Sequence, residues 1–516
     1  MLVDCLIFHT MTSFPNIPFD SALDIDELAL DTGGTILVGS DRGPSVPTGA
    51  RRPAKPPAVC TDSRDVARGG VFFALKGEKT DGHRYLAQVC EHHPAAIVIH
   101  DRAALASLTD CQRGDIAIIF VTNTGAALLS YAAAYRRRLC AEVFAVGGSN
   151  GKTTTCRLLS SILSSGFRGN ASRKSYNNSV GVPLTILATP PDSEYLICEV
   201  GTNAKGEIAP LIKTVAPTCS VITSIGREHL EGFGTLEGVI EEELMMLVTG
   251  VEAVIPADEP SLVPLAVRKV GSRNKITTFG FAPSADARII DCETSLDETR
   301  FSLVTAGSTS RFSVPLPGKH NASNAAAAII AGRRLGLHDS TIAAALARAI
   351  APDMRMQQVS IAGIHFINDA YNANPDSALA AITTFASIFG PTSGRLSADA
   401  ADMRAGGRRV LIFGDMLELG DLAQGLHDEV IAAAIAASCF ELLVLVGEHA
   451  SRSVINLDIA RLNQLAVTFP DAQAAAAAVH SILKPGDNVL LKGSRGTGIE
   501  KILKPFELMQ AERADG

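Results

Sequence analysis

Residues 146–155 read VGGSNGKTTT, a run of glycines, one lysine and three threonines with the composition of a phosphate-binding loop. The run departs from the standard G-x-x-x-x-G-K-[ST] pattern, because Val146 stands where the first glycine belongs. A hydrophobic run precedes it and a helical stretch follows it, and at such a junction backbone N–H groups can hold phosphate. We therefore expect Lys152 beside the β- and γ-phosphates of a nucleotide and the Thr153 hydroxyl on Mg²⁺. The alternative is an ordinary glycine turn with an incidental lysine.

Glu199 and His229 each follow a predicted strand, at the edge where an open parallel sheet binds its ligands. Glu199 opens the segment EVGTNAKGE, and His229 lies in GREHLEGFG. A carboxylate and a neutral imidazole are both ligands for a divalent metal. We expect the two side chains beside the phosphates, although a lone loop histidine is more often structural or solvated.

Two polar motifs in the last third of the chain also follow strands. Residues 368–377 read NDAYNANPDS, and residues 492–500 read KGSRGTGIE. The short polar side chains of the first motif are either turn formers or groups that bind ribose, phosphate or an amino-acid substrate. The glycines and the arginine of the second suit a phosphate or a carboxylate, and a plain helix entry is the alternative.

The elements that must position these residues form an α/β pattern. Strands are expected at 71–75, 95–99, 142–146, 194–198, 219–223, 364–368, 409–413, 442–446 and 488–492, and helices at 85–90, 128–138, 154–163, 324–333 and 341–350. Strands that alternate with helices predict parallel, doubly wound sheets. The length predicts about three domains. We place them at 1–139, 140–350 and 351–516, the second with the phosphate loop and the third Rossmann-like.

Composition narrows the class of protein. With 47% hydrophobic residues, the 516-residue chain can fill several cores, and its net charge of -8 argues against nucleic acid or an anionic membrane as the main partner. Ten scattered cysteines without a C-x-x-C pair indicate reduced thiols. Because no apolar run is long enough to span a bilayer and the N-terminus makes a poor signal peptide, we expect a cytoplasmic protein without membrane insertion. Segments 40–58 and 391–407 are expected to be surface loops.

Together these motifs resemble those of the Mur ligase family, the ATP-dependent amide-forming enzymes of peptidoglycan synthesis. The sequence GSNGKT at 148–153 matches that family's shortened loop, G-x-x-G-K-[ST], which the folylpolyglutamate synthases share. The motif at 368–377, GDMLELG at 414–420 and KGSRG at 492–496 look like those of the family member that adds D-alanyl-D-alanine. A folylpolyglutamate synthase-like ligase and a non-catalytic nucleotide-binding module are the alternatives.

The resemblance implies a role for each matching residue. The phosphates of ATP would be held by Gly148, Ser149, Asn150, Gly151, Lys152, Thr153, Thr154 and Arg355. Asn321 and Asn324 match adenine contacts, and Asp369 matches a carboxylate on the ribose. Implied substrate contacts are Ser63, Arg64, Lys76 and His83 for the uridine-nucleotide end, and Asn177, Asn178, Tyr371, Asn372, Asn374, Ser494 and Arg495 for the remainder.

The resemblance also implies a reaction between two substrates. The terminal carboxylate of UDP-N-acetylmuramoyl tripeptide attacks the γ-phosphate of ATP to give an acyl phosphate, which the amine of D-alanyl-D-alanine then attacks. Lys152 and Mg²⁺ would neutralise the charge on the transferring phosphoryl group, and no protein nucleophile is required. We also expect a monomer.

One departure from the family pattern concerns the metal. Downstream of HLEGFG the family usually has a lysine that becomes carbamylated and binds a second Mg²⁺, and Glu243 stands at that position. Since both groups are anionic oxygen ligands, we hypothesise that Glu243 replaces the carbamate. The expected metal ligands are thus Thr153, Glu199, His229 and Glu243, and the expected catalytic residues are Lys152, Glu199, His229 and Glu243. The alternative is that Glu243 lies on a solvated acidic helix face.

Overall fold

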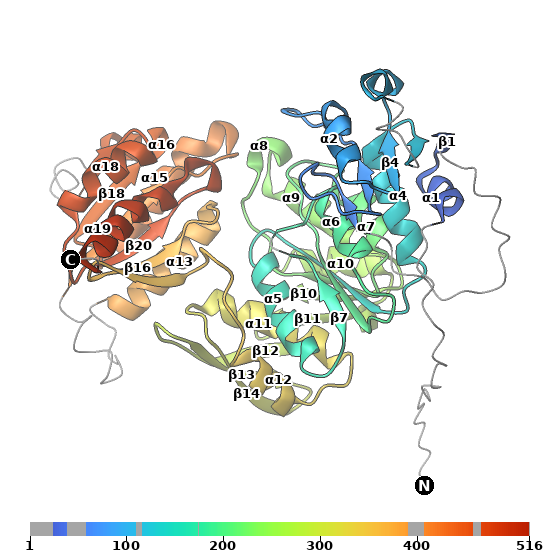
Figure 1. Ribbon diagram of the computed structural model, residues 1–516. Helices are drawn as coiled ribbons and strands as arrows, with labels where there is room; N and C mark the ends of the chain where they lie inside the picture. Colours follow the sequence, from blue (N-terminus) through green and yellow to red (C-terminus); the bar gives the residue numbers. More distant parts are fainter. Residues whose placement is uncertain are drawn as a thin grey trace, which may run out of the picture. The chain divides into compact units, whose positions relative to one another are not determined.

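The computed structural model describes residues 24–38, 58–109, 116–173, 175–390, 407–457 and 466–514, and the chain divides into two compact units between Ala127 and Leu128 (Figure 1). The N-terminal segment judged a poor signal peptide lies outside the described residues. So do the surface loops predicted at 40–58 and 391–407, apart from Ala58 and Gly407.

The first unit is built on one five-stranded sheet. Its strands are β1 Thr35–Val38, β2 Val59–Cys60, β3 Val71–Phe73, β4 Ala96–Ile99 and β5 Ala117–Phe120, and its helices are α1 Ile25–Thr32 and α2 Leu86–Glu91. The order is β1-β5-β4-β3-β2, with β1 antiparallel to β5 and the other neighbours parallel. Phe72, Ile97 and Ile118 pack with Leu86 in its core. Because both faces of these strands are buried, they read as continuous apolar runs in the sequence.

Among its described residues, the second unit contains two sheets, of which the larger has nine strands. They are β6 Glu142–Gly147, β7 Gly169–Ala171, β8 Tyr195–Glu199, β9 Cys219–Ile222, β10 Glu252–Pro256, β11 Ile276–Gly280, β12 Ala287–Thr294, β13 Thr299–Thr305 and β14 Ser308–Val314. Their order is β14-β13-β12-β11-β10-β9-β6-β8-β7. The strands from β7 to β12 are parallel, as predicted. At the other edge β13 and β14 run antiparallel, because the short connections there leave no room for a crossover helix.

Two helices fix the phosphate loop against the nine-stranded sheet. α5 Lys152–Ser164 and α11 Lys319–Arg333 pack side by side, and both bury residues in the same core (Figure 1). α11 is rich in alanine, and a Cβ atom at Gly332 would stand 2.7 Å from Cγ2 of Ile162. Small side chains therefore let α5 approach closely. Burial of a residue such as Leu159, which is fully buried, contributes about 1.5–3 kcal/mol.

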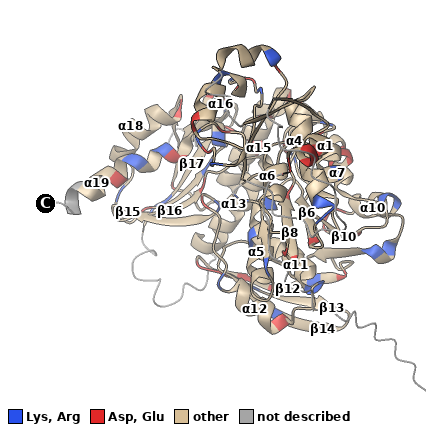
Figure 2. Cartoon of the chain, turned by 45° about the vertical axis from the view of Figure 1, so that its right-hand side comes forward, with Lys and Arg blue, Asp and Glu red and all other residues tan. Residues whose placement is uncertain are grey.

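The remaining described helices up to residue 350 include α4, which spans the boundary between the two units. They are α4 Thr124–Arg136, α6 Gly181–Leu187, α7 Ile208–Val215, α8 Leu230–Phe233, α9 Leu236–Glu243, α10 Leu262–Val270 and α12 Asp339–Leu346. Arg268 and Lys269 lie in the last turn of α10, where the helix dipole favours cations, and Figure 2 shows blue ribbon near this helix. Within the described ranges, every helix is too short or too polar to cross a lipid bilayer.

The six-stranded sheet of the second unit carries the C-terminal motifs. Its strands are β15 Gln357–Ile361, β16 Ile364–Asp369, β17 Arg409–Gly414, β18 Leu442–Val446, β19 Ala466–Phe469 and β20 Asn488–Lys492, and its helices are α13 Pro375–Phe389, α15 Ala423–Ala436, α16 Glu448–Asn456, α18 Ala472–Ile482 and α19 Lys504–Ala514. The order is β15-β16-β20-β17-β18-β19, with only β15 antiparallel among the described strands. Leu411 and Phe413 of β17 face one core, while Val410 and Ile412 face another. This alternation shows that the sheet is covered on both faces, as a doubly wound fold requires.

The predicted elements all overlap observed ones. Short 3-10 helices complete the described structure: η1 Gly82–Tyr85, η2 Arg102–Ser107, η3 Leu244–Met246, η4 Arg273–Lys275, η5 Gly420–Leu422, η6 Arg495–Thr497 and η7 Ile499–Leu503. The cysteines in the described ranges are free thiols, as predicted: Cys60, Cys90, Cys140, Cys156, Cys198, Cys219, Cys292 and Cys439.

Candidate active site

The loop between β6 and α5 turns on two glycines with left-handed backbone angles, Gly148 (φ 112°) and Gly151 (φ 87°). A Cβ atom at Gly151 would lie 2.1 Å from Oδ1 of Asn324, and one at Gly148 would lie 2.5 Å from Oγ1 of Thr223. Only glycine fits at either position, on account of its backbone angle and its missing side chain. The loop therefore delivers the chain to the first turn of α5, whose N–H groups have no helical partner and can bind an anion.

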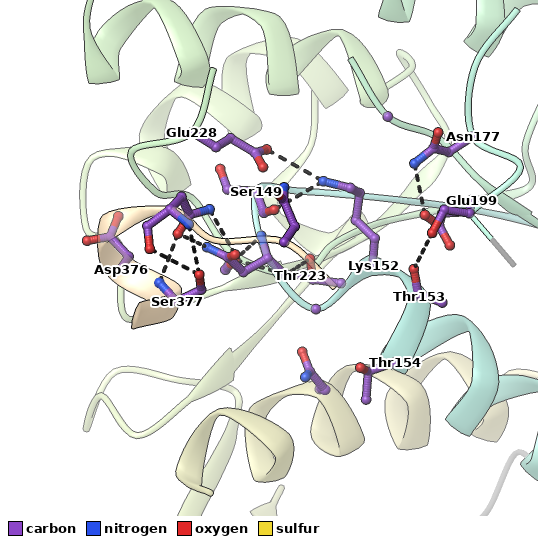
Figure 3. A pocket seen from close by; sticks show the side chains of 18 of the residues that line it. Ser149, Lys152, Thr153, Thr154, Asn177, Glu199, Thr223, Glu228, Asp376 and Ser377 are labelled. Carbon is purple, nitrogen blue, oxygen red and sulfur yellow. Dashed lines mark hydrogen bonds and ion pairs between the residues drawn. The ribbon is translucent and has the colours of Figure 1, made fainter. Parts of the chain in front are cut away.

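Lys152, the first residue of α5, folds back over this loop. Its Nζ donates to the carbonyl oxygens of Gly148 at 2.5 Å and Ser149 at 3.1 Å, and lies 3.5 Å from Oε1 of Glu228 (Figure 3). Burial alone would lower the pKa of Lys152, but the neighbouring carboxylates, above all Glu228, raise it. The ammonium group is therefore charged and ready to bind phosphate.

Three buried carboxylates surround Lys152. Glu199 and Glu243 are each 1% exposed and Glu228 is 5% exposed. Burial raises the pKa of Glu228 to about 8 and that of Glu243 to about 7, and it also raises the pKa of Glu199 against the opposing charges of Arg355 and Lys152. Among the described residues, none donates a hydrogen bond to Oε2 of Glu243. The cluster thus has more carboxylates than cations, which suits it to bind a further cation.

Glu199 and its neighbours form the other wall of the loop. Asn177 donates to Oε1 of Glu199 at 2.9 Å, and Thr153 lies beside the same carboxylate (Figure 3). Asn178 instead accepts the backbone N–H groups of Val180 and Gly181, at 3.1 and 2.9 Å. Asn177 therefore holds the Glu199 carboxylate, whereas Asn178 binds backbone N–H groups at the start of α6.

His229 lies on the loop after β9 and meets a residue from the six-stranded sheet. Its Nδ1 is hydrogen-bonded to Oε2 of Glu418, and its Nε2 lies 3.8 Å from Oε2 of Glu228. Burial lowers the pKa of His229, although the charge of Glu418 opposes this. The imidazole is therefore neutral, the form in which histidine binds metal.

The motif NDAYNANPDS contributes side chains to the same loop. Asn374 caps α13 in a reciprocal capping box with Ser377, and Pro375 occupies the first helical position. The amide of Asn374 also exchanges hydrogen bonds with that of Asn150, with Nδ2 of Asn374 2.9 Å from Oδ1 of Asn150. Asp376, two residues further, accepts a hydrogen bond from the backbone N–H of Arg227 at 2.6 Å. The motif therefore forms turns and also supplies groups to the site.

Arg355 and Tyr371 extend this wall. Nη2 of Arg355 donates to Oγ1 of Thr153 at 2.9 Å, and its guanidinium lies 4.2 Å above the Tyr371 ring. The Tyr371 hydroxyl donates to Ser175 at 2.6 Å, and Arg495 stands 5.9 Å from the same ring. Arg355 thus reaches the phosphate loop, in keeping with its expected role.

The residues expected at adenine and ribose lie further along the same wall. Nδ2 of Asn321 donates to the carbonyl of Pro317 at 2.8 Å, and Nδ2 of Asn324 donates to Oδ1 of Asn321 at 3.2 Å. Asp369 is paired with the buried Lys492, whose Nζ lies 2.7 Å from Oδ2 of Asp369. Lys492 also donates to the carbonyl of Asn372 at 2.7 Å.

One cavity of about 960 Å³ joins these residues. Of the residues predicted from the sequence, it is lined by Ser149, Asn150, Gly151, Lys152, Thr153, Thr154, Asn177, Asn178, Glu199, His229, Asn321, Asn324, Arg355, Asp369, Tyr371, Asn372 and Asn374. Glu243 does not line this cavity, but its carboxylate accepts a hydrogen bond from the backbone of Gly148. Ser494 donates to the carbonyl of Ala373 at 3.1 Å, so it supports the wall from behind.

The residues expected to bind the uridine nucleotide lie in the first unit. Arg64 and Lys76 are exposed, and Arg64 is paired with Asp62 at 2.5 Å. The hydroxyl of Ser63 donates to Gln88 at 3.2 Å. His83 is buried, with Nδ1 bonded to Asp81 at 2.7 Å and Nε2 accepting the backbone N–H groups of residues 100 and 101. Both ring nitrogens are occupied, so this imidazole orders its own loop.

Sequence reasoning missed Glu228 and Lys492, two charged residues that line the cavity, and Arg227, which bonds to residues of the six-stranded sheet region. Glu228 stands directly before His229 in the same motif, but nothing in the sequence marks it as buried. Arg227 pairs with Asp376 at 2.7 Å and Glu429 at 2.8 Å. Lys492 could have been found, because a lysine that ends an apolar strand must have a buried partner.

The expected metal ligands do not form a ready-made site. Among the described residues, no three His, Cys, Asp or Glu side chains lie close enough together to hold an ion. Thr153 and Glu199 are adjacent (Figure 3), Glu243 is hydrogen-bonded to the backbone of Gly148, and His229 is bonded to Glu418. The excess of buried carboxylate and the unpartnered oxygen of Glu243 nevertheless fit a divalent cation.

Comparison with known proteins identifies the family. The model of the Mur ligase middle domain matches residues 146–332, and that of the Mur ligase, glutamate ligase domain matches residues 390–495. The UDP-N-acetylmuramoyl-tripeptide--D-alanyl-D-alanine ligase of Bacillus subtilis is 32% identical over 455 residues, which cover 86% of this chain and 92% of that protein. The chain belongs to the Mur ligase family.

Other Mur ligases agree with this placement. The enzyme of the same name from Escherichia coli is 28% identical over 459 residues, covering 87% of this chain and 93% of that protein. A crystal structure of MurF from Acinetobacter baumannii is similar with a TM-score of 0.76 and 26% identity, covering 94% of this chain and 98% of that one. The resemblance stated from the motifs is confirmed.

Proposed function

We propose that this Mur ligase joins D-alanyl-D-alanine to UDP-N-acetylmuramoyl tripeptide at the expense of ATP. The products are the UDP-muramoyl pentapeptide, ADP and inorganic phosphate. The names of the relatives in Bacillus subtilis and Escherichia coli support these substrates over those of a folylpolyglutamate synthase-like ligase.

The observation that carries the proposal is the position of Lys152. It sits at the start of α5, above a loop that only glycines can form, and three buried carboxylates keep it charged. A protonated lysine at a helix N-terminus neutralises a triphosphate and the charge that develops as its terminal phosphoryl group leaves. Arg355, through Thr153, brings a second cation to the same place. An incidental lysine in a glycine turn would have no need of such surroundings.

Thr153, Glu199, His229 and Glu243 would hold Mg²⁺, as expected from the sequence. When bound, Mg²⁺ would supply positive charge that offsets the negative charge of the phosphates. Its arrival would also balance the surplus carboxylates beside Lys152. Glu243 in place of a carbamylated lysine would make this site independent of CO₂.

The chemistry then proceeds in two steps. A carboxylate oxygen of the tripeptide attacks the γ-phosphorus, the bond from that phosphorus to the bridging oxygen breaks, and ADP departs. The amine of D-alanyl-D-alanine attacks the acyl carbon, loses a proton, and expels phosphate together with the former carboxylate oxygen. Lys152 and Arg355 stabilise the phosphoryl group, while Asn374 and Tyr371 belong to the wall that keeps water from the acyl phosphate.

Phosphate release tests the proposal directly. With ATP, UDP-muramoyl tripeptide and D-alanyl-D-alanine we expect sustained release, and without the dipeptide at most one turnover. A tripeptide labelled with ¹⁸O in its terminal carboxylate should pass one label to the released phosphate. Release that requires a folate and glutamate would establish the alternative ligase, and ATP binding without any stimulated release would establish a non-catalytic module.

Several sequence predictions remain part of this proposal. They are the domain limits 1–139, 140–350 and 351–516, the monomeric state, the cytoplasmic location, and the binding of the uridine nucleotide by Ser63, Arg64, Lys76 and His83. The His83 ring is buried and both its nitrogens are hydrogen-bonded, so His83 supports that site. The exposed Arg64 and Lys76 would contact the ligand.

A further inference from the structure

His229 and Glu418 meet from two loops that are far apart in the sequence. His229 follows β9 of the nine-stranded sheet, and Glu418 follows β17 of the six-stranded sheet. Their side chains are joined by a hydrogen bond between Nδ1 and Oε2. A backbone bond reinforces this contact, since the N–H of Glu231 donates to the carbonyl of Glu418 at 3.1 Å. The proposed function assigns no role to Glu418.

Both residues adopt a backbone conformation that residues other than glycine usually avoid. His229 has φ 49° and Glu418 has φ 63°, in the left-handed region. Such angles cost about 1–3 kcal/mol each and persist where the surrounding structure determines them, often at functional sites. Two of them on either side of one hydrogen bond indicate that the pair is held in place by its loops.

The bond determines which ring nitrogen of His229 carries the proton. Because a carboxylate only accepts, Nδ1 must donate, and the neutral ring then presents the lone pair of Nε2. That nitrogen is on the side of Glu228, 3.8 Å from its Oε2, and the residue lines the cavity. Histidines that bind metals commonly donate their other N–H to a carboxylate in this way.

We infer that Glu418 is a positioning residue for His229. Glu418 fixes the Nδ1–H tautomer and turns Nε2 toward the metal of the reaction. His229 is therefore positioned to bind metal only when the six-stranded sheet is docked against the loop after β9. The inference rests on the proposed function. The Glu418 side chain is 55% exposed, so it contributes little to packing and its loss leaves the fold intact.

A purely structural role for Glu418 is the competing explanation, since its bond also ties the two sheets together. The chain offers a matched control for this. Glu429 makes another bond between the sheets, to Arg227 at 2.8 Å, and does not touch His229. If Glu418 only docked the sheets, Glu418→Ala and Glu429→Ala would behave alike.

Binding of Mn²⁺ to the full chain in the presence of ADP, followed by electron paramagnetic resonance, separates these roles. Mutation of a residue that accepts a hydrogen bond from a metal-bound histidine typically weakens metal affinity about 10- to 100-fold. We expect Glu418→Ala to weaken Mn²⁺ binding about 10-fold, Glu418→Gln to restore most of it because its amide oxygen still accepts from Nδ1, and Glu429→Ala to leave it within about 2-fold. With ¹⁵N-labelled histidine, the His229 signals should show the Nδ1–H tautomer in wild type and Glu418→Gln, and a mixture in Glu418→Ala.

His229→Ala separates the two proposals. If it weakens Mn²⁺ binding while Glu418→Ala leaves affinity and tautomer unchanged, or while Glu429→Ala weakens binding as much as Glu418→Ala, the positioning role is wrong and the proposed metal ligand stands. If His229→Ala binds Mn²⁺ as well as wild type, His229 is no ligand and the proposed metal set is wrong.

Discussion

Arg227 and Lys152 are both cations that face several carboxylates in the second unit, yet their surroundings differ. Arg227 is 28% exposed in its side chain and meets two partly exposed carboxylates, Asp376 and Glu429, through directed hydrogen bonds. Lys152 meets three carboxylates that are almost wholly buried, and only Glu228 comes within 3.5 Å. The first cluster satisfies its polar atoms, whereas the second leaves Oε2 of Glu243 without a donor.

The difference distinguishes a structural contact from a binding site. A cluster in which each carboxylate has its donor is complete without a ligand, so it can join two sheets. A buried cluster with more carboxyl groups than cations has oxygens without a partner, and these gain one when a further cation enters. Counting buried carboxylates against cations therefore separates a structural cluster from a binding site. The sequence alone does not show which carboxylates are buried.

Loss of Lys152 should have the largest effect. Lys152→Ala removes the cation that meets the transferring phosphoryl group, and we expect turnover to fall at least about 10²- to 10³-fold. Phosphate release with both substrates is the measurement. Lys205→Ala, at an exposed lysine on the same unit, is the control and should keep wild-type turnover. Equal rates for both variants would remove Lys152 from the chemistry.

Glu243 tests whether surplus charge attracts metal. Glu243→Gln keeps the shape and removes the charge, so we expect the Mg²⁺ concentration for half-maximal turnover to rise about 10-fold. Wild type should also be equally active in CO₂-free buffer. Glu241→Gln, on the same helix but exposed, should change neither quantity. An unchanged Mg²⁺ dependence in Glu243→Gln would contradict the metal role.

The pH dependence of stability sharpens the comparison in ligand-free protein. The pKa of Glu228 is about 8 in the folded chain against an ordinary value of 4.5, so the folded state binds the extra proton between these values. Stability should therefore fall as pH rises through this window and level off above about pH 8. In EDTA, the unfolding free energy of wild type, measured with urea, should fall by about 1–3 kcal/mol more than that of Glu228→Gln between pH 6 and pH 9. Identical slopes would mean that Glu228 is not protonated in the fold.

The Arg227 cluster should give the smallest effect. Arg227→Ala breaks partly exposed charged hydrogen bonds, so we expect a loss of about 1–2 kcal/mol in the unfolding free energy, reduced at high salt by screening. Urea unfolding at low and high ionic strength measures it, with Lys205→Ala as a surface control near zero. A loss that salt does not reduce would argue against an electrostatic role.

Much of the site was predictable because it follows strand ends. The glycines link a buried strand to the helix that Lys152 starts, Glu199 ends β8 and His229 follows β9, so sheet topology alone brings them together. The Mur ligase resemblance added Arg355 and Asp369, which no spacing could place near the loop.

Other features depend on contacts that the sequence does not encode locally. His229 and Glu418 are 189 positions apart, and their pairing exists only once both sheets are formed. Burial of Glu228 depends on the loop above it, and the same charge on a surface loop would look identical in the sequence. His83 shows the converse, since the sequence predicts substrate binding for it but does not reveal that both its ring nitrogens are already hydrogen-bonded.

The paired amides of Asn150 and Asn374 have a consequence for how this enzyme can vary. Each amide gives the other a donor and an acceptor, and Asn374 uses the same oxygen to cap α13. An acidic residue at either position would place two oxygens opposite each other, and an apolar one would leave an amide unmatched. A substitution at position 150 should therefore require a matching substitution at position 374. The nucleotide loop and the start of α13 are thus constrained to vary together.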